Sequence, residues 1–130
     1  MNQFEHIIMG VEGETVIRMS PPTQISNLNP FRNSSTMKDF WDFNTVYSKN
    51  NFFGLEEKHK KENEKVTILS TKLKAKDIIY VPAFFFVQFR VISDTMINFM
   101  WDYKCNSRIL KTMFKVLFDD NVGDEDGFEY

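Results

Sequence analysis

The chain has 130 residues, of which 42% are hydrophobic and 14 are Phe, and its formal net charge is −2. This length corresponds to one domain with enough apolar content for a hydrophobic core, and the near-zero charge argues against a nucleic-acid-binding surface. The longest apolar run, residues 78–87, is half as long as a membrane-spanning helix and is interrupted by Pro82, so we expect no membrane span.

Cysteine usage and the first residues indicate the compartment. Cys105 is the only cysteine, so no internal disulfide can form, which fits a reducing environment. The first residues have neither the basic start nor the apolar run of a secretory signal. We therefore expect an intracellular protein, without distinguishing cytoplasm or cytoskeleton from mitochondrion.

Two strands are predicted at the start of the chain, over residues 5–11 and 15–19. Gly13 lies in the turn between them and can adopt a positive φ. Pro21 and Pro22 end the second strand, because proline cannot donate to a strand ladder.

Residues 23–53 are rich in Asn and Ser but also in aromatic residues, so we expect a loop packed over the sheet, with a short helical turn near residues 37–41. Residues 56–65 form a mixed-charge run, which predicts a solvated loop or a short exposed helix; a partner-docking segment is the alternative.

Four further strands are predicted over residues 66–73, 78–81, 84–92 and 95–102, from alternating or continuous apolar residues. Ser93 and Asp94 are read as a two-residue turn that joins the last two strands. Residues 108–118 predict an amphipathic helix with one wide apolar face. The acidic residues 119–130 predict a disordered tail. The fold class is therefore mainly β with a C-terminal α-helix.

Several segments occur in the order found in one enzyme family: residues 7–22, 27–31, 41–44, 77–88 and 95–101. The set resembles the C-terminal half of a degenerate JmjC/cupin-type domain, nearest to the asparaginyl-hydroxylase-like (cupin-8) branch. The resemblance covers residues 4–118. It implies a partial double-stranded β-helix (a cupin or jelly-roll barrel) in residues 1–118, followed by the acidic tail 119–130. Lys76 replaces a family glycine at the corner before one strand.

Active members of that family hold iron(II) with two histidines and one carboxylate. The resemblance places the carboxylate at Asn2, the first histidine before Met1, and the second histidine at Val87. The 2-oxoglutarate-binding lysine falls at Thr15, and Asn98 matches an asparagine of the oxoglutarate pocket. Valine has no lone pair and cannot bind a metal. We therefore expect no catalytic, metal-binding or cofactor-binding residues and no cofactor, and we read Asn98 as a structural hydrogen-bonding residue.

No other residues rebuild a metal site in the sequence. His6 and His59 are the only histidines, and His59 lies in the charged run, where we expect it to be solvated. Glu5 and His6 are neighbours on a predicted strand, so their side chains point to opposite faces and cannot bind one ion together.

The first barrel strands of the family have no counterpart, which would leave sheet edges uncovered. We therefore expect partner protein subunits, including a strand or helix that completes the barrel. The resulting hypothesis is a non-catalytic pseudoenzyme that serves as a structural or accessory subunit of a multiprotein complex. The alternatives are an iron/2-oxoglutarate-dependent hydroxylase completed by a missing N-terminal half or partner chain, and a metal-free ligand- or peptide-binding cupin.

Overall fold

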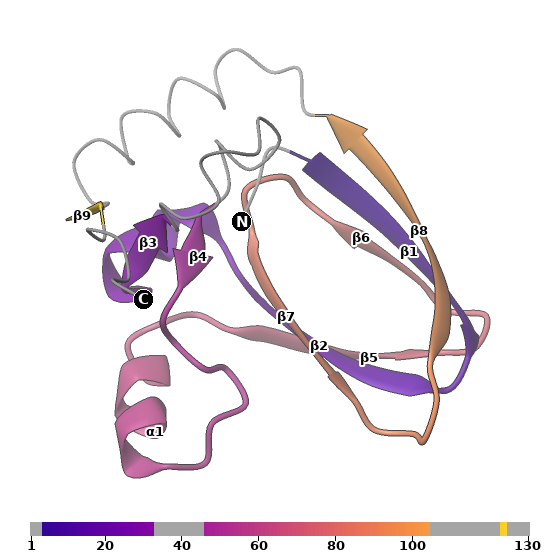
Figure 1. Ribbon diagram of the computed structural model, residues 1–130, viewed down its shortest axis with the longest axis horizontal. Helices are drawn as coiled ribbons and strands as arrows, with labels where there is room; N and C mark the ends of the chain where they lie inside the picture. Colours follow the sequence, from indigo (N-terminus) through magenta and orange to yellow (C-terminus); the bar gives the residue numbers. More distant parts are fainter. Residues whose placement is uncertain (1–3, 33–45, 105–122, 125–130) are drawn as a thin grey trace, which may run out of the picture.

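A computed structural model describes residues 4–32, 46–104 and 123–124, and it is mainly β (Figure 1). In chain order the elements are β1 (Phe4–Glu12), β2 (Glu14–Ser20), the 3-10 helix η1 (Pro22–Asn27), β3 (Pro30–Arg32), β4 (Tyr47–Ser48), α1 (Glu57–Asn63), β5 (Leu69–Lys74), β6 (Ile78–Val81), β7 (Phe86–Val91), β8 (Ile97–Lys104) and β9 (Gly123–Asp124). The predicted helical turn at 37–41 and the predicted helix at 108–118 lie outside the described residues.

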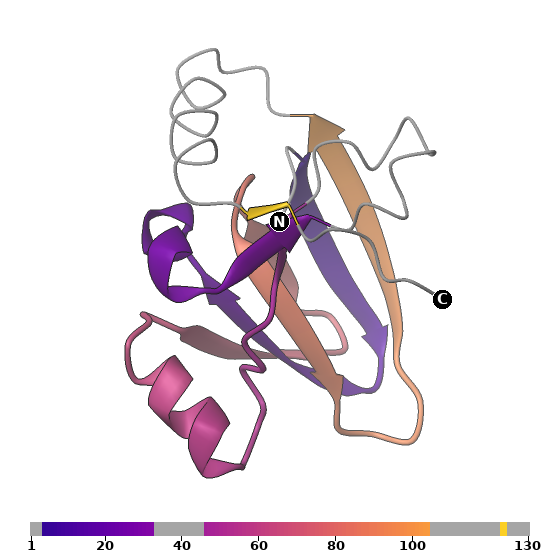
Figure 2. The ribbon, with the colours of Figure 1, turned by 60° about the vertical axis from the view of Figure 1, so that its left-hand side comes forward.

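Two antiparallel three-stranded sheets form the body of the protein, with strand orders β6-β1-β8 and β5-β2-β7. The pairs β1–β2, β5–β6 and β7–β8 are each consecutive in the chain. The chain therefore forms three long arms, and every arm bends once and contributes one strand to each sheet. Figures 1 and 2 show the two sheets diverging from the end where the arms bend.

The bend between β1 and β2 requires glycine. Gly13 has a φ of +86°, and a Cβ added to it would lie 2.1 Å from the carbonyl oxygen of Thr95. The neighbouring arm is bonded to this corner, since the Glu14 backbone N–H donates to the Ser93 hydroxyl at 2.9 Å and the Ile92 N–H donates to the Glu14 carbonyl at 2.9 Å. The predicted turn at Gly13 is confirmed, and it is also a contact between two arms.

The prediction that Ser93 and Asp94 form a two-residue turn joining two strands is wrong in detail. β7 ends at Val91 and β8 begins at Ile97, and the two strands belong to different sheets. The segment between them is held against the β1–β2 bend by the Ser93 hydroxyl, which also donates to the Thr95 carbonyl at 2.6 Å. The segment between β7 and β8 is therefore not a hairpin turn, and it is hydrogen-bonded to the β1–β2 bend, which is distant in the sequence.

The bend between β5 and β6 is built differently. Lys76 has a φ of +74°, and its N–H donates to the Gly10 carbonyl at 2.8 Å. The Gly10 N–H in turn donates to the Asp77 carbonyl at 3.0 Å. Because a side chain is strained in the left-handed region, this is a position where glycine would be favoured.

One hydrophobic core lies between the two sheets. Strand alternation directs one set of side chains inward from both sheets, and these residues form a single cluster. Its buried members are Ile8, Ile17, Met19, Leu73 and Val81. Ile79, Phe85, Val87 and Met96 pack against it.

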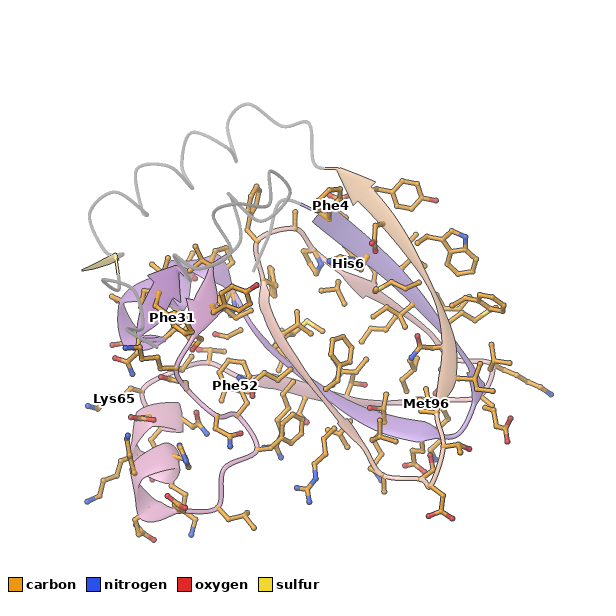
Figure 3. The ribbon with its side chains drawn as sticks, in the orientation of Figure 1. Phe4, His6, Phe31, Phe52, Lys65 and Met96 are labelled. Atoms are coloured by element: carbon orange, nitrogen blue, oxygen red, sulfur yellow. The ribbon has the colours of Figure 1, made fainter. Side chains whose placement is uncertain are left out.

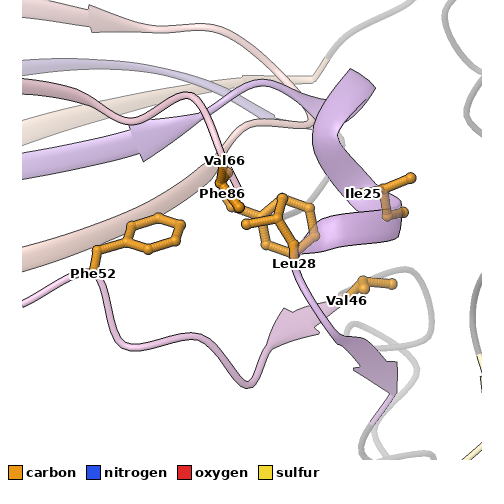
Figure 4. Close-up of a cluster of buried hydrophobic side chains, with 6 residues drawn as sticks. All are labelled: Ile25, Leu28, Val46, Phe52, Val66 and Phe86. Atoms are coloured by element: carbon orange, nitrogen blue, oxygen red, sulfur yellow. The ribbon is translucent and has the colours of Figure 1, made fainter. Parts of the chain in front are cut away.

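A second core lies beyond the sheets, where η1, β4 and the loop before α1 converge (Figure 4). Its buried members are Ile25, Leu28, Val46, Phe52, Val66 and Phe86. The described part of the segment 23–53 contributes four of these residues, Ile25, Leu28, Val46 and Phe52. It is less irregular than expected, since it contains η1, β3 and β4.

Val66 explains why β5 begins at Leu69 rather than at the predicted residue 66. The Val66 side chain is buried in the second core, and its N–H donates to the Asn63 carbonyl at 3.2 Å just after α1 ends. Residue 66 therefore belongs to the turn after α1, and pairing with β2 begins only at Leu69. Helix α1 has no buried residue, so the exposed short helix expected from the charge pattern is observed.

Part of the acidic tail is paired rather than free. Gly123 and Asp124 form β9, which runs parallel to β3 and pairs with Phe31 and Arg32. The third sheet therefore has the order β4-β3-β9.

Candidate functional site

The outer face of the sheet β6-β1-β8 is apolar and exposed. In the strand register, Met9 lies between Ile78 and Phe99. One row further along, Ile7 lies between Tyr80 and Trp101. We call the full set the outer apolar face: Ile7, Met9, Val11, Ile78, Tyr80, Ile97, Phe99, Trp101 and Tyr103.

These side chains remain open to solvent to an unusual degree for aromatic residues on a sheet. Phe99 is 57% exposed, Tyr103 is 54% exposed and Trp101 is 45% exposed. The Phe99 and Trp101 rings contact each other with centroids 6.3 Å apart. Figure 3 shows side chains projecting from β8 on the side away from the space between the sheets. The elements β3, β4 and α1 lie at the other end of the molecule (Figure 1).

The other sheet provides a comparison. Its outward side chains include Arg18, Lys72, Gln88 and Arg90, and Lys72 forms an ion pair with Glu14 at 3.1 Å. That pattern, apolar inside and polar outside, is the normal one for an antiparallel sheet. The outer apolar face therefore differs from the outer face of the sheet β5-β2-β7, which is polar.

The solvent-accessible area of this face can be estimated from the exposed fractions of its side chains. With side-chain areas of about 150–250 Å² for large residues, the outer apolar face amounts to about 700 Å². The largest apolar patch on a typical monomer is about 300–600 Å², and each partner of a stable complex contributes about 800 Å². The face is thus close to the size of one half of a protein interface.

A pocket of about 230 Å³ lies on the inner side of the same sheet, between it and β7. It is lined by Phe4, His6, Ile8, Val81, Pro82, Phe85, Val87, Phe89 and Met100. Among these described lining residues, His6 alone has a nitrogen or oxygen in its side chain. Its Nδ1 donates to Oδ1 of Asp102, its cross-strand neighbour on β8, at 2.6 Å. Figure 3 shows His6 on the side of β1 that faces the interior.

The positions expected from the family resemblance are not brought together. Val87 lines the pocket, where its methyl groups form part of the wall. Thr15 is buried, and its hydroxyl donates to the Arg90 carbonyl at 2.9 Å. Asn98 is exposed opposite Gly10 and does not line the pocket. Asn2 lies outside the described residues.

The two histidines differ from each other. His6 faces inward and Glu5 outward, as the strand pattern predicted. The expectation that His59 is solvated is wrong, because its side chain is only 23% exposed and packs against Gly54. Its nearest carboxylate oxygen, on Glu62, lies 3.7 Å away, which is too far for a hydrogen bond. Within residues 4–32, 46–104 and 123–124, no three His, Cys, Asp or Glu side chains are grouped to hold a metal ion.

Sequence reasoning missed the partnership of His6 and Asp102. The two residues are 96 positions apart, and only the pairing of β1 with β8 places them together. A polar residue on the inward side of each strand was the available signal, but it does not specify which strands are neighbours.

Comparison of the sequence with protein-family models and with curated proteins gives no match. In the part of the chain that the structure describes, no helix is long and apolar enough to cross a membrane.

Proposed function

We propose that this protein is a non-catalytic interaction subunit of a larger intracellular assembly, and that it docks through its outer apolar face. The observation that carries the proposal is the exposure of Phe99, Trp101 and Tyr103 in one row of an edge strand. Aromatic side chains of this kind are the residues that dominate protein interfaces when they are buried.

The chemistry of the face specifies the occupant. No Lys or Arg belongs to it, so it lacks the basic residues that draw proteins to anionic lipid or nucleic acid. Two acidic residues neighbour it in the strand register, one at each end: Glu5 opposite Tyr103 and Glu12 opposite Ile97. We therefore assign the face to an uncharged apolar surface on a different protein subunit, such as a sheet face or a pair of helices.

The finer fold assignment belongs to the same proposal. Two facing sheets built from three bent arms are compatible with a partial double-stranded β-helix of the JmjC/cupin type. Two positions support the resemblance: Val87 lines the space between the sheets, and Lys76 has a glycine-like φ where the family has glycine. Three strands per sheet leave β5, β6, β7 and β8 as edges among the described strands, and a partner strand could extend any of them.

The pocket favours a ligand-binding role over the hydroxylase as the second candidate. Eight of the nine lining side chains that the structure describes carry neither nitrogen nor oxygen, and the resemblance places an iron-binding histidine at Val87. A pseudoenzyme that keeps an interior pocket agrees with such a lining.

A site-specific cross-linking experiment tests the docking proposal. Tyr103 is replaced by p-benzoylphenylalanine, and the protein is irradiated in its native cells. The matched control carries the same group at Arg90, which lies on the outer face of the other sheet, also on an edge strand. We expect one discrete adduct with a different protein from position 103 and none from position 90.

The other outcomes overturn the assignment. An adduct between two copies of this chain would replace the heteromeric partner with a homodimer. Adducts with lipid would make the face a membrane contact. The absence of any adduct at position 103, or equal labelling from both positions, would show that the outer apolar face is not an interface.

A further inference from the structure

The inner pocket combines an apolar wall with one oriented polar group. His6 reaches it from near the start of β1, and the other described lining residues have hydrocarbon side chains or the thioether of Met100. A mostly apolar cavity with very few polar groups is the usual composition of a small-molecule site.

Asp102 determines which hydrogen bond His6 can make to a ligand. The carboxylate can only accept, so the proton on the ring must be on Nδ1. In the neutral imidazole, Nε2 then carries the lone pair and acts as an acceptor. Among the described residues Nε2 has no hydrogen-bond partner.

We infer that the inner pocket binds a small apolar molecule bearing one hydroxyl group, which donates a hydrogen bond to Nε2 of His6. The volume of about 230 Å³ suits a molecule with one ring or a short branched chain. A carboxylate ligand fits poorly, because no Lys or Arg is among the described residues that line the pocket, and His6 is already bonded to the Asp102 carboxylate. This site lies on the opposite side of the sheet from the outer apolar face, and the two proposals can fail independently.

Two matched probes test the assignment: 4-ethylphenol and its methyl ether, 4-ethylanisole. Both fill a similar volume, but only the phenol can donate to Nε2. Binding is measured at slightly alkaline pH by NMR, from the methyl signals of Ile8 and Val87 and from the ring nitrogen signal of His6. We expect the phenol to bind about tenfold more tightly than the ether, the effect of one buried hydrogen bond, and to shift the Nε2 signal.

Three variants separate the apolar wall from the polar group. His6→Phe removes the acceptor, so the two probes should bind equally. Val87→Phe fills the pocket and should abolish binding of both probes. Val91→Phe is the matched control, because Val91 lies on the same strand but outside the lining, and it should leave both affinities unchanged.

Two of the results that would overturn the inference are measured on the unmodified protein, so they do not depend on a variant that folds. Failure of both probes to shift the methyl signals at millimolar concentration would show that the pocket is not a ligand site. Equal affinities for the phenol and the ether would show that Nε2 of His6 does not accept a hydrogen bond from the ligand. Persistence of binding in Val87→Phe would place the probes elsewhere.

Discussion

Trp101 is the residue whose replacement most directly tests the outer apolar face. A Trp side chain has up to about 250 Å² of surface, and 45% of Trp101 is exposed, so about 110 Å² is available to a partner. At about 25 cal/mol per Å², burial of this area stabilises a complex by about 3 kcal/mol, or about a hundredfold in Kd. Trp101→Ser should therefore weaken binding to the partner about a hundredfold.

The assay is isothermal titration calorimetry with the partner identified by cross-linking from position 103. Phe89→Ser is the matched control, since Phe89 is 53% exposed and also lies on an edge strand, but on β7 and facing the inner side. We expect its Kd to stay within about twofold of the unmodified protein, because its ring is outside the docking face. Thermal unfolding of both variants verifies that each is folded at the assay temperature.

Two results would refute the reasoning. The first is a Kd for Trp101→Ser within about threefold of the original, which would mean that the exposed indole is not covered in the complex. The second is an equal loss of affinity in Phe89→Ser, which would show that general destabilisation, rather than the docking face, controls binding.

Three substitutions test the framework through the free energy of unfolding, measured by urea denaturation. Ile17→Ala, at a fully buried position of the inter-sheet core, should cost about 3–4 kcal/mol; a loss under about 1 kcal/mol would contradict that core. Gly13→Ala should cost about 3 kcal/mol through its positive φ and a clash with the backbone of Thr95; a loss under about 1 kcal/mol would exclude the tight bend. Lys76→Gly should raise stability by about 1 kcal/mol by removing left-handed strain, and a decrease would argue against the observed φ.

The strands themselves were accessible from the sequence because their signals are local. Alternation of apolar residues marks β1 and β2, Gly13 marks the bend, and Pro21 marks the end of β2. The error at β5 has a local origin too: Val66 continues the alternation but is used by the second core, which depends on residues far away in the chain.

Which strands share a sheet was not accessible from local pattern. Ser93 and Asp94 have the composition of a hairpin turn, but the hydrogen bonds of Glu14 with Ile92 and Ser93 show that this segment contacts another arm. The pairing of His6 with Asp102 depends on the same long-range register.

The sequence alone determined that the chain is mainly β and where most of its strands lie. It also determined that the charged segment is exposed and that the Val87 side chain cannot bind a metal. Each of these properties depends on neighbouring residues or on a single side chain. Tertiary structure decided which face each residue occupies. Tyr80, Phe99 and Trp101 lie in predicted strands, whose pattern does not say which face is buried. They form a solvent-exposed surface because the pairing of β6, β1 and β8 places other residues of these strands on the inner side of the sheet. Alternation predicts that a strand has two faces, but only the packing of distant strands determines which of them water reaches.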